Sequence, residues 1–570
     1  MLKRLLRQLL RAPDAARGEL LARGRAERAR GDAVAALPML QAALAQDDAD
    51  AAVLTELGLC YRALGRRVEA RAALERAAAS DPAAVLPLLY LGNLAHEEGR
   101  PDDAFAAYRA ALALDAHNAA LHYNLALTLA SCGEAADAAD AFRRCLAQSP
   151  DYADARASLL FALTLSDRAG AEETVAEHLE WGRRSADPLW RERTFANAAE
   201  PQRRLRIGYV SADFFGHAAS DFIHSFLPQH RRESFDIHCY ANAPLPQDAQ
   251  ALYGHSWRDI SRLDDAQAAG LIEADGIDIL VDLSGHTRGN RLLVFAHRPA
   301  PLQLTFLGYP NSTGMRAMDY RLTDACGDPP GMSEVRYRER LLRLPHSVWC
   351  YRPPEDDMPD AGPLPAARKG CITFGSMNNV AKLNPGLIDL WAELLRQVPH
   401  ARLLLATIAP GQTRERLLRR FAELGVDAQR IDFSARLPKR DFRALHREVD
   451  IALDAWPCNG GATTCETLWL GVPVVSLAGE DFRSRAGLSL LSAIGLPQLV
   501  AGDRAGYLAI AAGLAGDLAG LQRLRASLRE RMRASPLCDA PAYTAALEQI
   551  YRDIWVEWCA RAALGAAPFP

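Results

Sequence analysis

The chain has 570 residues, of which 49% are apolar and 24% are charged, and its formal net charge is −4. This length exceeds what one compact core holds, so we expect about two to four domains. The near-neutral charge gives no reason to expect a nucleic acid or an anionic membrane as a partner. No stretch approaches the roughly 18 uncharged apolar residues that a membrane-spanning helix needs.

The cysteines and the N-terminal residues both bear on the compartment. The eleven cysteines include no CxxC pair, which favours reduced thiols over a disulfide framework. The first eleven residues are basic and amphipathic but have no continuous apolar core, unlike a secretory signal. We therefore predict a cytoplasmic protein.

The first third of the chain repeats with a period of 34 residues. Glycines recur at positions 31, 65, 99 and 133, and the four copies span residues 17–50, 51–84, 85–118 and 119–152. A helical pattern continues to about Arg193. This period is typical of tetratricopeptide repeats, in which each pair of amphipathic helices is covered by the next pair. We predict that the four glycines end first helices in the left-handed conformation.

From Arg204 onward, short β-rich runs alternate with helical segments, which predicts parallel sheets. One set of runs lies at 205–210, 277–283 and 302–308, and a second set at 371–376, 402–406, 431–433, 449–454 and 472–477. The proline-rich residues 352–369 separate the two sets and are predicted to be a linker. Two doubly wound α/β lobes would bind ligands at the carboxyl ends of their strands, in the cleft between the lobes.

Several motifs of other enzyme classes are absent from the sequence. It contains no GxGxxG or GxxxxGK[ST] phosphate loop, which counts against dehydrogenases and P-loop kinases. It contains neither HExxH nor paired CxxC, so a metal site has no support.

Two loops in the second set suit a diphosphate. Residues 375–382 follow a strand and end in Lys382, one of only four lysines in the chain. Residues 458–466 follow another strand and open a helix. Small residues let a phosphate approach the backbone, and the free N–H groups and dipole of a helix start favour anions. A tight strand-to-helix turn with an N-cap threonine explains the second loop equally well.

A series of short motifs runs in order across residues 200–556. They are Gly216-His217, Gly308-Tyr309-Pro310, Phe374-Gly375-Ser376 with Asn378 and Lys382, Phe433-Ser434 with Pro438-Lys439, Cys458-Asn459-Gly460 with Thr463, and Ser535-Pro536-Leu537. This series, preceded by the repeats, resembles the catalytic region of protein O-GlcNAc transferases.

The resemblance implies an α-helical tetratricopeptide superhelix followed by an α/β GT-B fold, with two Rossmann-like lobes and an interlobe cleft. The expected domains are the repeats at 1–195, the N-terminal catalytic lobe at 196–365 and the C-terminal nucleotide-sugar-binding lobe at 366–570. It further implies an inverting transfer of GlcNAc from UDP-GlcNAc to Ser/Thr hydroxyls of proteins, without a cofactor or metal. The expected partners are UDP-GlcNAc and protein or peptide acceptors, which would lie along the repeat groove and the interlobe cleft.

The resemblance also places the site residues, position by position. Asn379 and Lys382 are expected at the donor diphosphate, Leu437, Pro438 and Lys439 in the uracil pocket, Phe442 near the nucleotide, Gly461, Ala462, Thr463 and Thr464 at the phosphate-binding turn, and Glu466 at the ribose. His217 occupies the position of an active-site histidine, and Asp275 that of an acid proposed to assist.

One departure from the family pattern leaves two alternatives open. The usual His-Thr-Thr turn is here Gly461-Ala462-Thr463, which lacks an imidazole and a hydroxyl. One alternative is therefore a GDP-fucose-dependent protein O-fucosyltransferase of the same family. The other is a repeat scaffold with a catalytically weak nucleotide-binding lobe.

The chemistry of the transfer assigns roles to two residues. Without a metal, the departing diphosphate needs a cation and oriented N–H donors, and Lys382 fits the role of that cation. His217 follows the first strand of the first lobe, and an imidazole titrates near neutrality. It would either take the proton of the acceptor hydroxyl or orient the substrate while a donor phosphate oxygen acts as the base.

Overall fold

The computed structural model describes residues 2–353 and 361–564, with side chains described from residue 15 onward except at 250. Residues 354–360 of the predicted linker therefore lie outside the described ranges. The chain divides into two compact units. The first holds helices α1 to α7, most of α8 and residues 410–416, and the second holds most of α9 and the remaining residues. Among the described helices, none combines the length and apolar character needed to cross a membrane.

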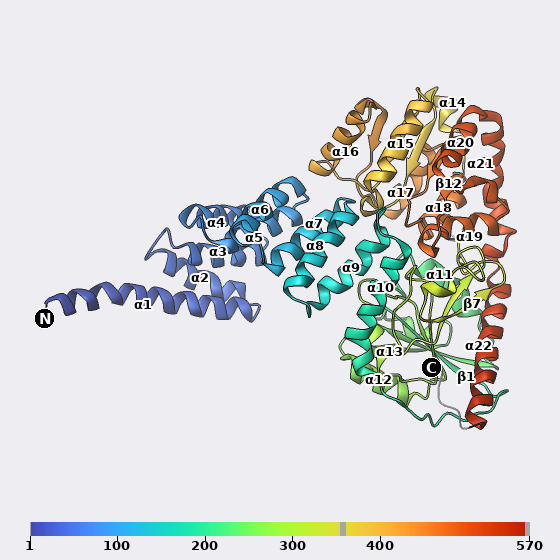
Figure 1. Ribbon diagram of the computed structural model, residues 1–570, viewed down its shortest axis with the longest axis horizontal. Coiled ribbons are helices and arrows are strands. Elements are labelled where there is room, and N and C mark those ends of the chain that lie inside the picture. Colours follow the sequence, from blue (N-terminus) through green and yellow to red (C-terminus); the bar gives the residue numbers. More distant parts are fainter. Residues whose placement is uncertain (1, 354–360, 565–570) are drawn as a thin grey trace. The chain divides into compact units, whose positions relative to one another are not determined.

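The first unit consists of helix pairs that match the predicted repeats (Figure 1). Its helices are α1 (Leu2–Ala29), α2 (Ala33–Leu44), α3 (Ala51–Ala63), α4 (Arg67–Ser80), α5 (Val85–Glu97), α6 (Pro101–Leu114), α7 (Ala119–Ser131) and α8 (Ala135–Gln148). A fifth pair, α9 (Ala153–Leu165) and α10 (Ala171–Trp181), follows. The tetratricopeptide prediction is confirmed.

The repeated glycines have two different physical roles. Gly31, Gly65, Gly99 and Gly133 have φ angles of +87°, +72°, +69° and +84°, and each follows the first helix of its pair as predicted. Gly58 instead allows close packing, because a Cβ atom there would lie 2.6 Å from Cγ of Leu74 on the second helix of the pair. Small residues at helix crossings thus bring the paired helices into contact.

The second unit contains two parallel sheets. The first sheet has the strand order β3-β2-β1-β4-β5-β6-β7 and the second β10-β9-β8-β11-β12-β13. The first comprises β1 (Leu205–Ser211), β2 (Phe235–Ala241), β3 (Ser256–Asp259), β4 (Ile279–Asp282), β5 (Leu302–Thr305), β6 (Tyr320–Asp324) and β7 (Arg340–Leu344). The second comprises β8 (Thr373–Ser376), β9 (Arg402–Leu405), β10 (Ile431–Phe433), β11 (Ile451–Leu453), β12 (Val474–Leu477) and β13 (Val500–Ala501).

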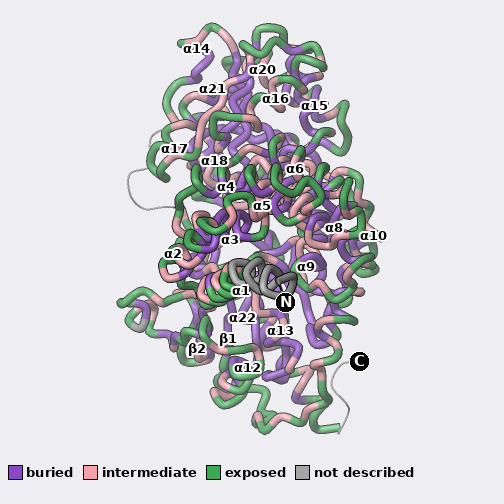
Figure 2. The backbone as a smooth tube through the Cα atoms, turned by 90° about the vertical axis from the view of Figure 1, so that its left-hand side faces the viewer, coloured by how far each residue is buried: buried purple, intermediate pink, exposed green. Residues whose placement is uncertain are grey.

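The central strands of the sheets are buried (Figure 2). Ile207 of β1 lies opposite Ile237 of β2 and Ile279 of β4, and all three are buried. Strands buried on both faces read as continuous apolar runs, which explains why these segments showed no polar alternation in the sequence. The predicted GT-B arrangement of two Rossmann-like lobes is confirmed.

Helices connect the strands of both lobes. The first lobe has α11 (Ser220–Phe226), α12 (Asp265–Ala274) and α13 (Leu292–Ala296). The second lobe has α14 (Pro365–Lys369), α15 (Pro385–Gln397), α16 (Gln412–Glu423), α17 (Lys439–Leu445), α18 (Ala462–Trp469), α19 (Ala486–Ala493), α20 (Arg504–Gly516) and α21 (Leu518–Arg533).

The last described helix, α22 (Ala540–Ala563), returns to the first lobe, where it packs against α11, β5 and β7. The hydroxyl groups of Tyr551 and Tyr209 lie 3.0 Å apart in this contact, and Oε1 of Glu548 lies 3.1 Å from Nδ1 of His230. These four side chains are buried, so the polar atoms of the contact are paired within the core.

Candidate functional site

The predicted site residues follow strands at the switch points of the two sheets. In the first sheet the chain runs outward from β1 to β3 and returns to β4 beside β1, and in the second it runs from β8 to β10 and returns to β11 beside β8. His217 follows β1, Lys382 follows β8, and the 455–461 turn follows β11. Ligands of open parallel sheets bind at the carboxyl ends of the strands at such points.

Lys382 is held on the turn that follows β11. Its Nζ donates a 2.8 Å hydrogen bond to the backbone carbonyl of Asn459. The buried side-chain amide of Asn459 in turn donates to the carbonyl of Ala455 at 2.8 Å and accepts from the N–H of Gly487 at 3.1 Å. The two predicted diphosphate loops are therefore joined, and the ammonium group is fixed at their junction.

A buried carboxylate supports the same turn. Asp454 accepts hydrogen bonds from the N–H groups of Gly460 (2.8 Å) and Ala455 (2.9 Å) and from the hydroxyl of Ser476 (2.7 Å). Burial raises the pKa of Asp454 to about 6, although these hydrogen bonds and the nearby Lys382 cation act in the opposite direction. Sequence reasoning placed Asp454 within a strand and missed this role.

The start of α18 completes the turn. Its N-cap residue, Gly461, provides no side-chain hydrogen bond to the first helical N–H groups. Uncapped N–H groups at a helix start are suited to an anion. Gly461, Ala462 and Thr463 are partly exposed, whereas Thr464 is buried, and a Cβ atom at Gly460 would lie 2.5 Å from the Thr464 hydroxyl oxygen. The structure thus places Thr464 beneath the turn.

Asn379 serves its own loop rather than pointing freely to a ligand. It is exposed, and its side-chain oxygen accepts a 3.0 Å hydrogen bond from the N–H of Ala381. It is the N-cap of the single turn Val380–Lys382 that carries Lys382. In this structure, Asn379 therefore shapes the Lys382 loop.

Glu466, expected at the ribose, is paired with Arg443 of α17. Nε of Arg443 donates to Oε1 of Glu466 at 2.7 Å, and the two side chains are 11% and 16% exposed. Arg443 lies in the same helix as Phe442. Sequence reasoning missed Arg443, because the pair joins positions that are 23 residues apart.

The residues expected at the uracil surround the start of α17. Pro438 is the N-cap of this helix and accepts a 2.9 Å hydrogen bond from the N–H of Phe442. Leu437 and Phe442 are partly exposed, and Pro438 and Lys439 are exposed. Nζ of Lys439 lies 3.8 Å from Oδ2 of Asp221 in α11 of the first lobe. Burial raises the pKa of Asp221, and the Lys439 cation opposes this shift.

His217 lies on the first lobe, immediately before α11. Its side chain is 56% exposed, and its Nδ1 accepts a 3.2 Å hydrogen bond from the N–H of Ala219. Oδ1 of Asp213 lies 3.7 Å from the same nitrogen, and burial raises the pKa of Asp213. With Nδ1 acting as an acceptor, a neutral ring carries its proton on Nε2 and presents a donor.

Asp275 does not lie near His217, so the expectation that it assists catalysis is wrong. Asp275 ends α12 just before β4, at the amino edge of the first sheet, whereas His217 follows the carboxyl end of β1. Its carboxylate accepts hydrogen bonds from the hydroxyl of Tyr240 at 2.8 Å and from Nη2 of Arg258 at 3.3 Å. The sequence held a signal for this, because Asp275 directly precedes the predicted strand at 277–283 and so lies at its amino end.

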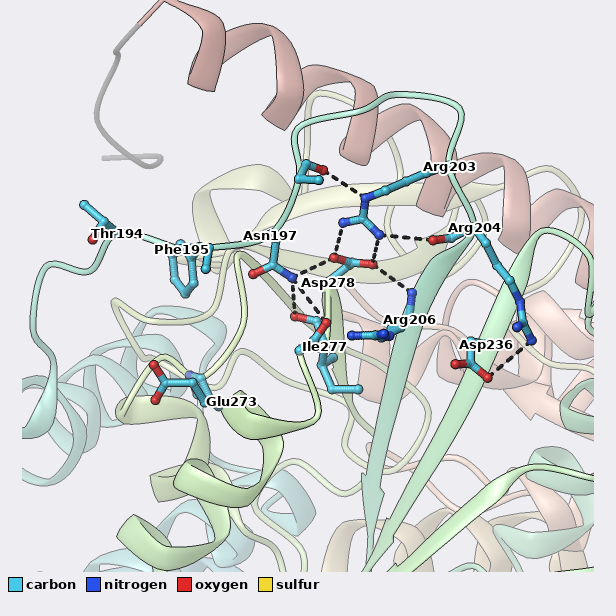
Figure 3. A pocket seen from close by; sticks show the side chains of 14 residues that line it. Thr194, Phe195, Asn197, Arg203, Arg204, Arg206, Asp236, Glu273, Ile277 and Asp278 are labelled. Atoms are coloured by element: carbon cyan, nitrogen blue, oxygen red, sulfur yellow. Dashed lines mark hydrogen bonds and ion pairs between the residues drawn. The ribbon is translucent and has the colours of Figure 1, made fainter.

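A cavity of about 520 Å³ opens at this same amino edge, beside Gly276 (Figure 3). Two of its arginines are paired with carboxylates: Nη1 of Arg203 lies 2.8 Å from Oδ2 of Asp278, and Nη2 of Arg204 lies 3.3 Å from Oδ1 of Asp236. Nη1 of the third, Arg206, donates to the backbone carbonyl of Asp275 at 3.3 Å. Nδ2 of Asn197 also donates to Asp278 at 2.7 Å. Because it lies at the opposite edge of the sheet from His217, this cavity is not the predicted donor site.

Comparison with protein families agrees with this arrangement. The model of glycosyl transferase family 41 matches residues 189–351 and 364–547, which include both lobes. The chain belongs to this family. A tetratricopeptide repeat model matches residues 27–88 and 95–159.

Sequence similarity to individual curated proteins supports the same family. The chain is 39% identical over 433 residues to a rice protein (Oryza sativa subsp. japonica) named probable UDP-N-acetylglucosamine–peptide N-acetylglucosaminyltransferase SPINDLY. The match covers 74% of this chain and 46% of that protein. A tomato protein (Solanum lycopersicum) of the same name is 38% identical, with 72% of this chain and 45% of that protein covered. The chain thus spans about half the length of the curated relatives it matches.

A solved structure matches nearly the whole chain. It is a mutant of the O-GlcNAc transferase of Thermobaculum terrenum, with a TM-score of 0.77 and 35% identity. The match covers 97% of this chain and 99% of that chain, so the combination of repeats and two lobes occurs in both.

Proposed function

We propose that this chain is an inverting glycosyltransferase that moves GlcNAc from UDP-GlcNAc to Ser/Thr hydroxyls of proteins. The observation that carries the proposal is the 2.8 Å contact of Lys382 with Asn459 beside the uncapped start of α18. A cation and a helix start without a side-chain cap lie there, at the switch point of the second sheet, where a diphosphate would be bound. Relatives named as UDP-N-acetylglucosamine–peptide transferases support the choice of donor and acceptor.

In the proposed reaction, the second lobe holds the donor. Leu437, Pro438 and Lys439 would contact the uracil, and Phe442 would lie near the nucleotide. Glu466 would contact the ribose, and the 461–463 turn with Lys382 the diphosphate. The acceptor oxygen attacks the anomeric carbon from the face opposite UDP, so the bond to the sugar forms as the bond to the diphosphate oxygen breaks. Lys382 and the helix N–H groups stabilise the negative charge that grows on the departing UDP.

The acceptor side is assigned to the first lobe. With Nδ1 of His217 accepting from Ala219, Nε2 is the donor of the neutral ring, so we assign His217 to orienting the reacting groups. The proton of the acceptor hydroxyl then passes to a phosphate oxygen of the donor, and UDP departs as the leaving group. The reaction as proposed needs no cofactor and no metal.

The partners and the compartment complete the proposal. Protein or peptide acceptors would lie along the repeat groove and between the lobes, supported by the match to a tetratricopeptide model. All eleven cysteines are free of disulfides, which agrees with a reducing, cytoplasmic location.

The decisive experiment is mass spectrometry of a protein mixture incubated with the full chain and UDP-GlcNAc. Ser/Thr residues carrying a single N-acetylhexosamine are the expected product, and the Lys382→Ala variant should produce none above background. Parallel incubation with GDP-fucose tests the other donor. Transfer of deoxyhexose instead of N-acetylhexosamine, or no transfer from either donor, would refute the proposal.

A further inference from the structure

A buried arginine in the second lobe binds the end of a repeat-like helix. Arg483 lies between β12 and α19 and is 5% exposed. Its Nη1 donates to the carbonyl of Leu163, and its Nη2 donates to the carbonyl of Ala169 at 2.7 Å. These carbonyls lie at and just beyond the C-terminal end of α9. The last carbonyls of a helix have no intrahelical partner, and a cation there also interacts favourably with the helix dipole.

The charge of this arginine is balanced within the same loop. Nε of Arg483 donates to Oδ2 of Asp481 at 2.9 Å, and the hydroxyl of Ser484 donates to Oδ1 of Asp481 at 3.0 Å. A buried guanidinium that satisfies several carbonyls and has a paired carboxylate is strongly held in one orientation.

The backbone of the same residue holds the turn that carries Lys382. The carbonyl of Arg483 accepts a 2.9 Å hydrogen bond from the N–H of Asn459. Asn459 is the residue whose own carbonyl accepts from Lys382. A continuous chain of hydrogen bonds therefore runs from the end of α9, through Arg483 and Asn459, to the ammonium group of Lys382.

The α9–α10 turn (residues 163–170) is fixed independently on both lobes. The hydroxyl of Thr164 lies 2.9 Å from that of Tyr309 in the first lobe. Asp167 of the turn binds the second lobe: its Oδ2 accepts a 3.0 Å hydrogen bond from the N–H of Gly386. Gly386 lies in the first turn of α15, the helix that follows the Lys382 loop. The turn therefore has a fixed position that does not depend on Arg483, and the hydrogen bonds from Arg483 attach the 481–487 loop to it.

We infer that Arg483 is a positioning residue that couples the α9–α10 turn to the diphosphate turn (residues 455–461) and so sets the place of Lys382. The inference rests on the proposed function for its effect on catalysis. Arg483 itself does not act on the donor. Without its guanidinium, the 483–487 segment loses these bonds to the end of α9. The Arg483 carbonyl that accepts from Asn459 is then held less firmly, and the donor must order the turn when it binds.

The test compares Arg483→Gln with Arg338→Gln in the full chain. Arg338 is the control, because it also joins the region after α10 to a lobe. Its Nη1 lies 3.1 Å from the Asp187 carboxylate, which follows α10, and 3.2 Å from the carbonyl of Gly314 in the first lobe. Three quantities are measured: the KM values for UDP-GlcNAc and for an acceptor peptide, and amide hydrogen exchange across residues 455–461. A third variant, Arg483→Lys, keeps the cation but has a single ammonium for several carbonyls.

We expect Arg483→Gln to raise the KM for UDP-GlcNAc by about 10-fold and to speed exchange in the diphosphate turn, because the donor then has to order that turn. The KM for the peptide should stay within about twofold, Arg338→Gln should change neither donor KM nor exchange in this turn, and Arg483→Lys should fall between Gln and wild type. A merely structural role would lower the amount of active protein and so the apparent kcat, without a change in donor KM.

Two failures can be told apart. If the wild type transfers GlcNAc but Arg483→Gln leaves both the donor KM and the exchange of residues 455–461 unchanged, the inference is overturned. If the wild type transfers no GlcNAc, the proposed function fails, and the hydrogen exchange experiment still decides whether Arg483 holds the turn.

Discussion

Arg443 and Glu466 are joined by a 2.7 Å ion pair between α17 and α18. The residues assigned to the uracil lie at the start of α17, and those assigned to the phosphate and ribose lie at the start of α18. The pair therefore fixes two parts of the proposed nucleotide site relative to each other. It also orients the Glu466 carboxylate, whose Oε1 is bound by the arginine, so that a ribose hydroxyl would be met by Oε2.

Removing either partner should weaken nucleotide binding. We expect Glu466→Gln and Arg443→Gln each to raise the Kd for UDP by about 10-fold. In the double variant, the Kd should rise by less than the product of the two single increases, because the side chains act as a pair. Isothermal titration with UDP measures all three. Arg447→Gln, at an exposed position after α17, is the control. Fully multiplicative effects would show that the two side chains act separately.

Lys382 should affect the chemical step more than binding. The negative charge on the diphosphate grows as the glycosidic bond breaks, so Lys382→Ala should lower kcat by about 100-fold or more. UDP affinity should change only a few-fold, because the base and ribose contacts remain. Lys369→Ala is the matched control: Lys369 precedes β8, at the opposite edge of the sheet, and pairs with Glu448 at 2.9 Å. Near-native turnover of Lys382→Ala would contradict its assignment.

His217 and Lys439 should show opposite effects, because they lie on different lobes. His217→Ala should lose most of the transfer activity while its UDP affinity stays close to wild type. Lys439→Ala should weaken UDP binding directly, and its side chain is 63% exposed, so folding should be unaffected. Steady-state rates and UDP titrations of both variants are compared. A fully active His217→Ala variant would leave the histidine with a structural role.

Much of the fold could be predicted from the sequence, because it depends on short-range patterns. The 34-residue period and its glycines determine the helix pairs, and apolar runs such as 205–210 become the central strands. Strands β2, β3, β6, β7 and β13 were missed. In β2, Asp236 and His238 interrupt the apolar residues, and β7 carries Arg340 and Arg343 as an edge strand does.

The site was predictable only as far as loops follow strands. The pattern identified the Lys382 loop and the 458–466 loop separately, but not that they touch. Partners such as Arg443 for Glu466, or Arg483 for Asn459, come from distant positions and are brought together by the tertiary fold. Asp275 illustrates the converse error: it was assigned by resemblance alone, although its place before the predicted strand at 277–283 puts it at the amino edge of the sheet.

Acid should weaken the attachment of α10 to the first lobe. His178 of α10 is fully buried, with Nε2 2.8 Å from the hydroxyl of Tyr309 and Nδ1 2.6 Å from the carbonyl of Thr174. Burial lowers the pKa of His178 to about 4, opposed by the hydrogen bond to Thr174 and aided by the charges of Arg321 and Arg483. Beside it, burial lowers the pKa of His286 to about 3. Both rings are therefore neutral in the folded protein at neutral pH.

The sign of the effect follows from the lowered pKa of His178. An unfolded histidine takes up its proton near pH 6.5 and the folded His178 only near pH 4, so the stability that the neutral ring contributes is present above pH 6.5 and is lost as the pH falls from 6.5 toward 4. At pH 5 the loss from His178 amounts to about 2 kcal/mol. The apparent Tm of the wild type should therefore fall between pH 7.5 and 5.0.

The variant His178→Gln isolates this contribution. Glutamine can still bond to the Tyr309 hydroxyl but does not titrate, so the variant should be less stable at pH 7.5 through imperfect packing and yet lose fewer degrees on acidification than the wild type. His400→Gln, at an exposed position, should keep the wild-type pH dependence. His286 continues to titrate in all three proteins, which leaves part of the acid sensitivity in the variant. An equal fall in apparent Tm for wild type and His178→Gln would show that the buried His178 ring does not set the acid stability of this contact.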